Sequence, residues 1–383
     1  GGAAAVYQLR GDLAGDPVTR IRNPHVDPDA QEMDGTKLIV SSFFRRARMG
    51  AALRTCSTAL AAALLATGAA ALQAGDYGPD HPGVPDFVRQ MQSEHGFSAE
   101  HVQALLDQAV HQDNIIKAIS RPAERVKPWH EYRAIFITDQ RIERGLAFWA
   151  EHADTLARAE REYGVEPEVI LAIIGVETFY GRNMGSYRVL DALATLGFDY
   201  PPRADFFRKQ LMSYMVLTRE QQIDPLTLKG SYAGAMGFGQ FIPSSYQAYA
   251  VDFDGDGKVD IWNNPVDAIG SVANYFHQHG WTHGARVAIE AQVSGDRYRD
   301  GLTEPKGLEA RQSVGELKAL GWTPQATLAD DEQVMAFEFD AGERMRYWVG
   351  LNNLYVITRY NRSVMYAMVV HQLADLLREA RPE

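Results

Sequence analysis

A single glutamate, Glu177, stands inside a long apolar stretch of this chain. Residues 173–182 read IIGVETFYGR, and apolar side chains, aromatic rings and two glycines make up most of the segment. An ionised carboxylate loses favourable hydration when it leaves water, so carboxylates are rarely buried without a partner. Any fold that buries this segment must therefore give Glu177 either a stabilising partner or a chemical role.

The spacing around Glu177 predicts a helix over residues 168–180, in which the glutamate borders an apolar stripe of Val169, Ile173, Val176 and Tyr180. Burial there would raise the pKa of the carboxyl above its model value of about 4.3. A carboxyl that is protonated at neutral pH can serve as a general acid. Taken alone, however, the segment favours a structural glutamate that pairs with Arg182 or Arg188.

The rest of the chain has a mainly helical pattern. Short helices are expected between residues 85 and 156, with Ser98 as an N-cap. Further helices are predicted at 204–222, 244–250 and 265–279, and an amphipathic helix closes the chain. Between 283 and 345, alternating segments such as RVAIEAQV and QVMAFEFD predict a small insert that contains strands. The sequence therefore predicts an α+β protein that is mainly α.

The first part of the chain has the pattern of an exported protein. Residues 1–48 lack a sustained apolar period and are expected to be an upstream extension outside the fold. Residues 49–74 combine a basic flank, a short apolar stretch and small residues, which is typical of a secretory signal, with an alanine-rich helix of the fold as the alternative. We therefore expect a periplasmic protein, with membrane attachment left open.

Charge and cysteine content exclude several function classes. The 383 residues carry a net charge of -11 at pH 7, which argues against nucleic acid as the partner. The single cysteine, Cys56, allows neither a disulfide framework nor a zinc site with paired cysteines. An enzyme that acts on a neutral or mixed-charge polymer is compatible with both observations.

A second informative stretch, GSYAGAMGFGQFIPSSY at residues 230–246, has four glycines in its first ten residues. Glycine lets the backbone approach a ligand closely and exposes its N–H and C=O groups, so this stretch suits a substrate-binding loop. The glycine spacing fits neither the phosphate-binding loop of nucleotide hydrolases nor the dinucleotide fingerprint. A tight turn that packs helices together is the alternative.

Four motifs follow one another along the chain: ETFYGR at 177–182, GSYAGAMGFGQFIPSS at 230–245, DAIGSVANYF at 267–276 and NLYVITRYNRS at 353–363. Together they resemble the lytic murein transglycosylases of the B type. The resemblance implies a lysozyme-like helical core with an N-terminal helical lobe and a small β-containing insert. We accordingly expect the lobe at 75–150, the catalytic core at 151–282, the insert at 283–345 and a return to the core at 346–383.

The resemblance also implies an activity on peptidoglycan. The family cleaves the β-1,4 bond between N-acetylmuramic acid and N-acetylglucosamine without water and leaves 1,6-anhydromuramic ends. By correspondence of motifs, Glu177 would protonate the leaving oxygen and then accept the proton of the muramoyl C6 hydroxyl. Sugar contacts are implied for Ser231, Met236, Gln240, Tyr275, Asn353 and Tyr360.

The expected partners are peptidoglycan glycan strands, which a monomer would bind, and association with proteins of cell-wall synthesis or degradation is left open. A hydrolytic muramidase is one alternative, and its products would have reducing ends. A catalytically inactive peptidoglycan-binding protein, in which Glu177 is structural, is the other.

Residues 252–267, DFDGDGKVDIWNNPVD, resemble an EF-hand calcium loop. Acids stand at loop positions 1, 3, 5 and 9, but Asn263 replaces the usual bidentate glutamate at position 12. Because B-type transglycosylases can carry such a loop, the resemblance implies a structural Ca²⁺ bound by Asp252, Asp254, Asp256, Lys258 and Asp267. A solvated turn rich in Asp and Asn is the alternative.

Overall fold

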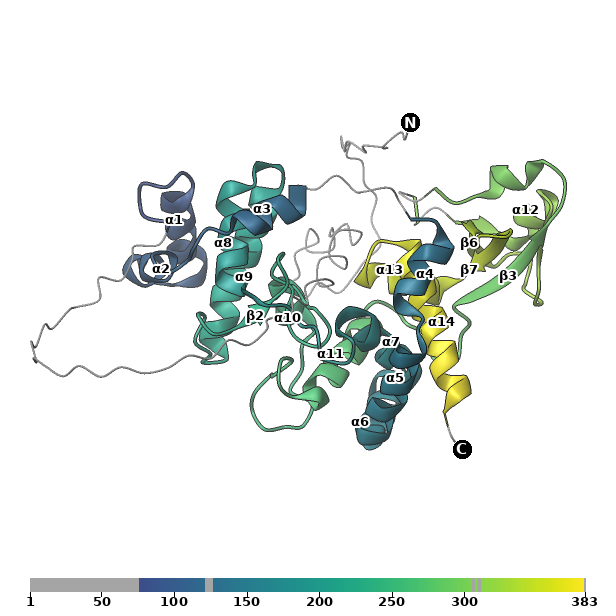
Figure 1. The fold of residues 1–383 in the computed structure, drawn as a ribbon, viewed down its shortest axis with the longest axis horizontal. Helices are drawn as coiled ribbons and strands as arrows, with labels where there is room; N and C mark the ends of the chain where they lie inside the picture. Colours follow the sequence, from purple (N-terminus) through teal and green to yellow (C-terminus); the bar gives the residue numbers. More distant parts are fainter. Residues whose placement is uncertain (1–75, 121–126, 305–306, 309–310, 382–383) are drawn as a thin grey trace, which may run out of the picture.

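The computed structural model describes residues 76–120, 127–304, 307–308 and 311–381. The predicted extension at 1–48 and the predicted signal at 49–74 lie outside these residues. Figure 1 shows the first helices at one end of the molecule, a small sheet at the opposite end, and a group of helices around α7 between them. This arrangement confirms the predicted α+β class with mainly helical content.

Three short helices open the described chain, namely α1 (Val84–His95), α2 (Ala99–Leu106) and α3 (Asp113–Ser120). The Ser98 hydroxyl accepts a hydrogen bond from the main-chain N–H of His101, which confirms the predicted N-cap. Helix α1 packs against α9 (Ala204–Glu220), and α3 packs against α8 (Val189–Asp199). The first helices therefore dock on the helix pair α8 and α9.

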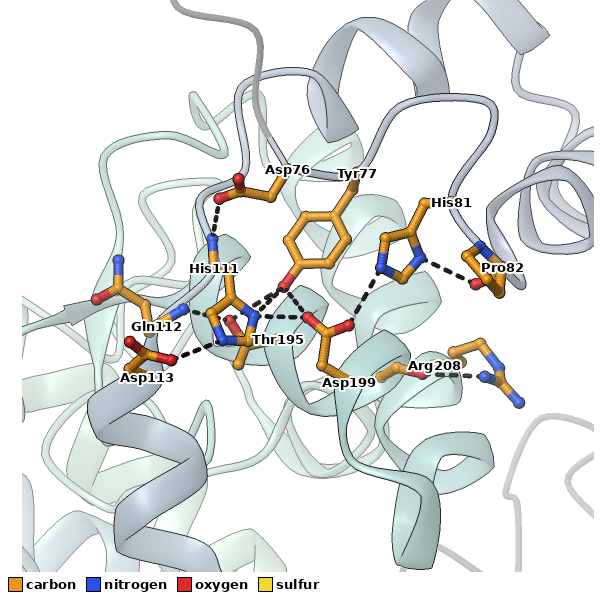
Figure 2. A network of polar contacts seen from close by, with 11 residues as sticks. Asp76, Tyr77, His81, Pro82, His111, Gln112, Asp113, Thr195, Asp199 and Arg208 are labelled. Atoms are coloured by element: carbon orange, nitrogen blue, oxygen red, sulfur yellow. Dashed lines mark hydrogen bonds and ion pairs between the residues drawn. The ribbon is translucent and has the colours of Figure 1, made fainter.

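Asp199, at the end of α8, anchors this docking (Figure 2). Its carboxylate accepts a hydrogen bond from the Tyr77 hydroxyl at 2.8 Å and lies 3.1 Å from Nε2 of His81 and 2.6 Å from Nδ1 of His111. Tyr77 is fully buried, and this burial raises its pKa above the ordinary range. Side chains from before α1 and from between α2 and α3 thus converge on one carboxylate.

Helix α7 (Pro167–Thr178) is buried along nearly its whole length. Gly164 ends the preceding helix α6 (Ala153–Tyr163), and Pro167 occupies the first turn of α7. Four helices pack against α7, namely α5 (Asp139–Glu151), α6, α11 (Pro265–Gln278) and α14 (Val364–Ala380). Because neighbours cover it on several sides, its apolar residues do not form the single stripe that the sequence predicts.

A two-stranded sheet connects the segment after α7 to the glycine-rich loop. Strand β1 (Tyr187–Arg188) pairs antiparallel with β2 (Lys229–Gly230), and Tyr187 lies opposite Gly230. Helix α10 (Pro243–Tyr249) follows the loop, and the short 3-10 helix η3 (Pro201–Arg203) precedes α9. The helices predicted at 204–222, 244–250 and 265–279 are confirmed as α9, α10 and α11.

The second sheet has five antiparallel strands in the order β4-β6-β7-β3-β5. The strands are β3 (Ala288–Val293), β4 (Gln312–Ser313), β5 (Trp322–Pro324), β6 (Gln333–Asp340) and β7 (Met345–Gly350). One face packs with α12 (Val314–Ala319) and the 3-10 helix η4 (Arg297–Gly301) into a core of its own, which includes Trp322 and Val349. The structure thus contains the strands that the alternating segments predict.

After the sheet the chain returns to α7 through α13 (Asn352–Tyr360) and α14. Helix α14 packs along α7, and it also contacts α5 and α4 (Trp129–Phe136). The first turn of α14 thereby reaches the end of α7 that carries Glu177. In the part of the chain that the structure describes, no helix combines the length and apolar character needed to cross a membrane.

Candidate active site

Glu177 lies in the last turn of α7, one residue before its end. The side chain keeps a partly exposed surface, while dense protein surrounds its carboxyl group. Burial raises the pKa of Glu177 to about 7, although a hydrogen bond from Tyr366 acts in the opposite direction. The carboxyl can therefore hold a proton at neutral pH and still release it.

A tyrosine from the last helix binds this carboxyl. The Tyr366 hydroxyl donates a hydrogen bond of 2.6 Å to Oε1 of Glu177. Tyr366 is fully buried in the first turn of α14, where the Ser363 hydroxyl accepts the main-chain N–H of Tyr366. Burial, and next the charge of Glu177, raises the pKa of Tyr366 well above its ordinary value, so the phenol remains a donor.

Two further tyrosines feel the charge of Glu177. The pKa values of Tyr132 in α4 and Tyr360 in α13 are raised, first by burial and then by the glutamate. Three helices, α4, α13 and α14, thus place neutral tyrosines near one acid. The alternative, in which Glu177 pairs with Arg182 or Arg188, does not match these contacts. Arg188 pairs with Asp191, and Arg182 lies over the Phe179 ring.

The chain turns sharply after Glu177. Phe179, Tyr180 and Gly181 have φ values of 53°, 57° and 81°, a run of left-handed conformations that non-glycine residues rarely adopt. The helix therefore ends at Thr178, and the prediction that it continues to residue 180 is wrong. Tyr180 belongs to this turn and lies outside the helix.

Thr178 fastens the turn to the glycine-rich loop. Its hydroxyl lies 2.9 Å from the carbonyl oxygen of Phe238 and accepts the main-chain N–H of Gly181 at 3.0 Å. Thr178 is fully buried, so these contacts are shielded from water. The residue after the glutamate thus fixes the position of the loop beside it.

The structure places the three predicted sugar contacts of the glycine-rich loop in different environments. The Ser231 hydroxyl accepts the main-chain N–H groups of Ala233 and Ala235, and it shapes the loop. The Gln240 amide donates to the carbonyls of Met184 and Gly237 and keeps a partly exposed surface. Met236 is fully buried between bridges to Gly230 and Phe241.

Tyr275 and Tyr360 form an aromatic pair with ring centroids 4.7 Å apart. The Tyr360 hydroxyl donates to the carbonyl of Gly239 at 2.5 Å, which connects α13 to the glycine-rich loop. The Tyr275 hydroxyl donates to the carbonyl of Arg359 at 2.6 Å. The structure therefore brings Tyr360 together with the loop and with Glu177, and Tyr275 packs against Tyr360.

Asn353 occupies a structural position. Its side chain is fully buried, and it exchanges hydrogen bonds with the main chain of Thr282 and donates one to the carbonyl of Ala285. These contacts hold the chain after α11 against α13. In this structure the amide is committed to main-chain partners.

Sequence reasoning missed Tyr366 and Tyr132. Tyr366 lies in SVMYAMVVHQ, which reads as an ordinary amphipathic helix, and it is 189 positions away from Glu177. Tyr132 belongs to a helical segment that contains none of the four motifs. A local pattern gave no signal for either residue, because tertiary packing alone brings them to the acid.

The acidic loop between α10 and α11 gathers oxygen donors. One carboxylate oxygen from each of Asp252, Asp254 and Asp256 lies within 4.8 Å of the others. Asp252 accepts N–H groups from the loop, including Gly257, and this lowers its pKa. Asp267 is fully buried and accepts the N–H groups of Phe253 and Asp260. A set of carboxylates and main-chain carbonyls in a tight turn fits a hard cation such as Ca²⁺.

Comparison with known proteins gives consistent matches. The Transglycosylase SLT domain family matches residues 80–375. The membrane-bound lytic murein transglycosylase B of Escherichia coli (strain K12) is 46% identical over 316 residues, which cover 80% of this chain and 85% of that protein.

Two solved structures are also similar. The soluble lytic transglycosylase SltB1 of Pseudomonas aeruginosa is 57% identical with a TM-score of 0.75, and the match covers 78% of this chain and 99% of that one. The E. coli lytic transglycosylase Slt35 in complex with calcium is 45% identical with a TM-score of 0.74, covering 81% of this chain and 96% of that one.

Proposed function

We propose a single-glutamate mechanism for this chain, which belongs to the lytic murein transglycosylase B family. The chain is an enzyme of that family: it cleaves the β-1,4 bond between N-acetylmuramic acid and N-acetylglucosamine in peptidoglycan and forms 1,6-anhydromuramic ends. The proposal concerns how its residues do so. One observation supports this mechanism above all. Protein surrounds the carboxyl of Glu177, burial raises its pKa to about 7, and the Tyr366 hydroxyl donates a hydrogen bond to it.

In the first step, protonated Glu177 donates its proton to the glycosidic oxygen, and the bond from that oxygen to muramoyl C1 breaks. The resulting carboxylate then accepts the proton of the muramoyl C6 hydroxyl. The C6 oxygen bonds to C1, which closes the 1,6-anhydro ring and returns Glu177 to its protonated form. Since the nucleophile belongs to the substrate, one carboxyl performs both transfers, whereas ordinary glycosidases need two.

The surroundings of Glu177 suit this cycle. A buried acid keeps its proton until the leaving oxygen needs it. After transfer, the Tyr366 hydroxyl stabilises the carboxylate through a short hydrogen bond. We further propose that Ser231, Gln240, Tyr275 and Tyr360 line the sugar sites. The fully buried Met236 and Asn353 would contribute through the main chain that they hold in place.

The mechanism predicts a specific pH dependence. Because the acid must be protonated and its pKa is about 7, kcat is expected to be flat below this value and to fall as pH rises through it. The Tyr366 hydrogen bond lowers the pKa of Glu177, so Tyr366→Phe should move the midpoint of the fall to higher pH. Initial rates of anhydro product release from glycan strands, measured across pH, test both statements.

Tyr163→Phe serves as the control for this pH experiment, because Tyr163 lies in α6 and lacks a contact with Glu177 among the described interactions. It should leave the midpoint unchanged. The assignment of Glu177 as the acid would be contradicted if kcat rose as pH increased through 7, or if Tyr366→Phe left the pH midpoint of kcat unchanged.

We also propose that Asp252, Asp254 and Asp256, whose carboxylates lie together, hold a structural Ca²⁺. Asp267 and the carbonyl of Lys258 would complete its ligands. The three clustered carboxylates repel one another without a cation, and a cation would relieve this repulsion. Ca²⁺ would brace the loop that leads into α11, the helix that carries Tyr275. It supplies no chemistry to the sugar, and Glu177 performs both proton transfers without it.

Calcium is expected to stabilise the protein against heating. At saturating Ca²⁺ the Tm should rise by about 3–6 °C, since a ligand that binds only the folded state stabilises it. Asp256→Asn removes one charge from the cluster and should abolish most of the rise, whereas Asp331→Asn, at an exposed position elsewhere, should preserve it. Differential scanning calorimetry with Ca²⁺ or with a chelator measures the effect; equal Tm values under both conditions would reject the site.

The remaining proposals concern the setting of the enzyme. We propose that it acts in the periplasm as a monomer on peptidoglycan glycan strands, with residues 49–74 as its export signal. We also propose a division into a lobe at 75–150, a core at 151–282, an insert that begins at 283 and a return segment that ends at 383. The expected end of the insert at 345 moves to 350, because β7 (Met345–Gly350) pairs with β3 and β6 in the sheet. Fractionation of cells that express the full precursor tests the location.

A further inference from the structure

We propose that Arg141 is a positioning residue for Glu177 and acts through the main chain of the two helices that meet at the acid. This inference rests on the proposed role of Glu177. Arg141 lies in the first turn of α5, and its side chain takes no part in the proton transfers described above.

Arg141 is buried, with 6% of its surface exposed. Its guanidinium donates to the carbonyl oxygens of Ile135 at 3.0 Å, Phe136 at 2.5 Å and Gly175 at 3.1 Å. A buried arginine usually pairs with a carboxylate, because an uncompensated buried charge is costly. Here the hydrogen-bond partners that the described chain provides are all main-chain carbonyls. The charge is therefore used to hold backbone in place.

The three carbonyls belong to the ends of two helices. Ile135 and Phe136 end α4, the helix that carries Tyr132, and Gly175 lies two residues before Glu177 in α7. Carbonyls at helix C-termini lack intrahelical partners and form the negative end of the helix dipole, so a cation is favoured there. Arg141 thus connects α7, which carries Glu177, to α4, which carries Tyr132. The charge of Glu177 contributes to the raised pKa of Tyr132.

Arg141 also contacts the left-handed turn after Glu177. Its Cζ lies 5.2 Å from the centre of the Phe179 ring, within range of a cation–π interaction. The main-chain N–H of Phe179 donates to Gly175, so the turn and the guanidinium share one carbonyl acceptor. Without these contacts the strained backbone at Phe179 would relax toward commoner conformations.

Tyr180, the next residue of the turn, packs against both α5 and α7. A methyl group added at Gly145 of α5 would lie 2.3 Å from the Tyr180 hydroxyl oxygen, and one added at Gly175 would lie 2.6 Å from it. The ring therefore occupies a slot between α5 and α7 that exists because both residues are glycines. Together, Arg141 and Tyr180 fix α5 to the last turn of α7. This turn carries Glu177, which accepts the hydrogen bond from Tyr366.

Arg141→Lys tests this inference, because lysine keeps the charge but loses the planar fork that reaches several carbonyls. We expect kcat to fall about tenfold or more with KM changed less than about twofold, since small displacements of a catalytic group reduce turnover. We also expect the high-pH midpoint of kcat to fall below that of the wild type, because a looser site admits water that stabilises the Glu177 carboxylate. The variant keeps the titratable groups that face Glu177, namely Tyr132, Tyr360 and Tyr366.

Arg161→Lys is the matched control, because Arg161 is exposed on α6. It should change neither kcat nor the pH midpoint of kcat. A lower Tm in Arg141→Lys with unchanged kcat per folded molecule and an unchanged pH midpoint would mean a purely structural role and would overturn the inference. Should Arg141→Lys fail to fold, Phe179→Leu removes the cation–π contacts of this ring with Arg141 and Arg182, while the side chain of Phe179 takes no part in the hydrogen bonds of Arg141. It is expected to shift the midpoint in the same direction by a smaller amount, and an unchanged midpoint would overturn the inference.

Glu177→Gln, assayed in parallel, distinguishes the proposed acid–base role of Glu177 from the positioning role of Arg141. Retained activity in Glu177→Gln would reject the proposed function itself. Loss of activity there, combined with an unshifted pH profile in Arg141→Lys, would reject only the positioning role.

Discussion

Replacement of Glu177 by glutamine is expected to lower kcat by at least about 10³-fold, with KM changed less than about twofold. Glutamine keeps the shape of the side chain and an acceptor for the Tyr366 hydroxyl, so the fold should be preserved. It cannot donate or accept the catalytic proton, and general acid–base catalysis typically contributes about 10²–10⁴-fold. Because one carboxyl performs both proton transfers, the loss should lie in the upper part of that range. Initial rates of anhydro product release measure it.

Glu168→Gln provides a matched control on the same helix. Glu168 is also buried in α7, and burial also raises its pKa, but its carboxylate lies 3.6 Å from Arg378. It should retain more than about half of the activity, since a raised pKa without access to substrate does not catalyse. A Glu177→Gln variant with more than a tenth of normal activity would contradict the assigned role.

Replacement of Gly181 by alanine is expected to destabilise the fold by about 2–4 kcal/mol and to reduce activity as well. Gly181 has a φ of 81°, which costs other residues about 1 kcal/mol. A Cβ there would lie 2.3 Å from Cε1 of Phe238, and overpacking of this kind typically adds about 1–3 kcal/mol. Since the Phe238 carbonyl holds Thr178, displacement of Phe238 would disturb the turn beside Glu177. Urea unfolding monitored by circular dichroism gives the stability change.

Gly280→Ala separates the two contributions. Gly280 has a φ of 83°, and a Cβ there would meet no heavy atom within 4 Å. Its cost should therefore be limited to about 1 kcal/mol from the backbone conformation. If Gly181→Ala were no more destabilising than Gly280→Ala, the close contact between Gly181 and Phe238 would have no energetic importance.

Local patterns in the sequence were sufficient to predict most of the helices. Ser98 acts at a helix boundary through a hydrogen bond to the nearby main chain, so the sequence reveals it. The alternating pattern of QVMAFEFD likewise predicts a strand, and the structure confirms it as β6.

Features that depend on tertiary packing could not be predicted in this way. The helix around Glu177 reads as continuous through Tyr180, but it ends at Thr178 because the chain must turn toward the glycine-rich loop. The raised pKa of Glu177 follows from burial where α14 packs over α7, and no local pattern encodes those contacts. The Arg141 contacts with two helix ends are invisible for the same reason.

Mass spectrometry of the muropeptides released from purified peptidoglycan, with the wild-type chain and Glu177→Gln side by side in water enriched in ¹⁸O, tests the central claim most directly. We predict 1,6-anhydromuramic ends without ¹⁸O from the wild type and a loss of these products in the variant. Reducing ends that carry ¹⁸O, or anhydro products released equally by Glu177→Gln, would contradict a mechanism in which Glu177 alone transfers the protons and the substrate supplies the nucleophile.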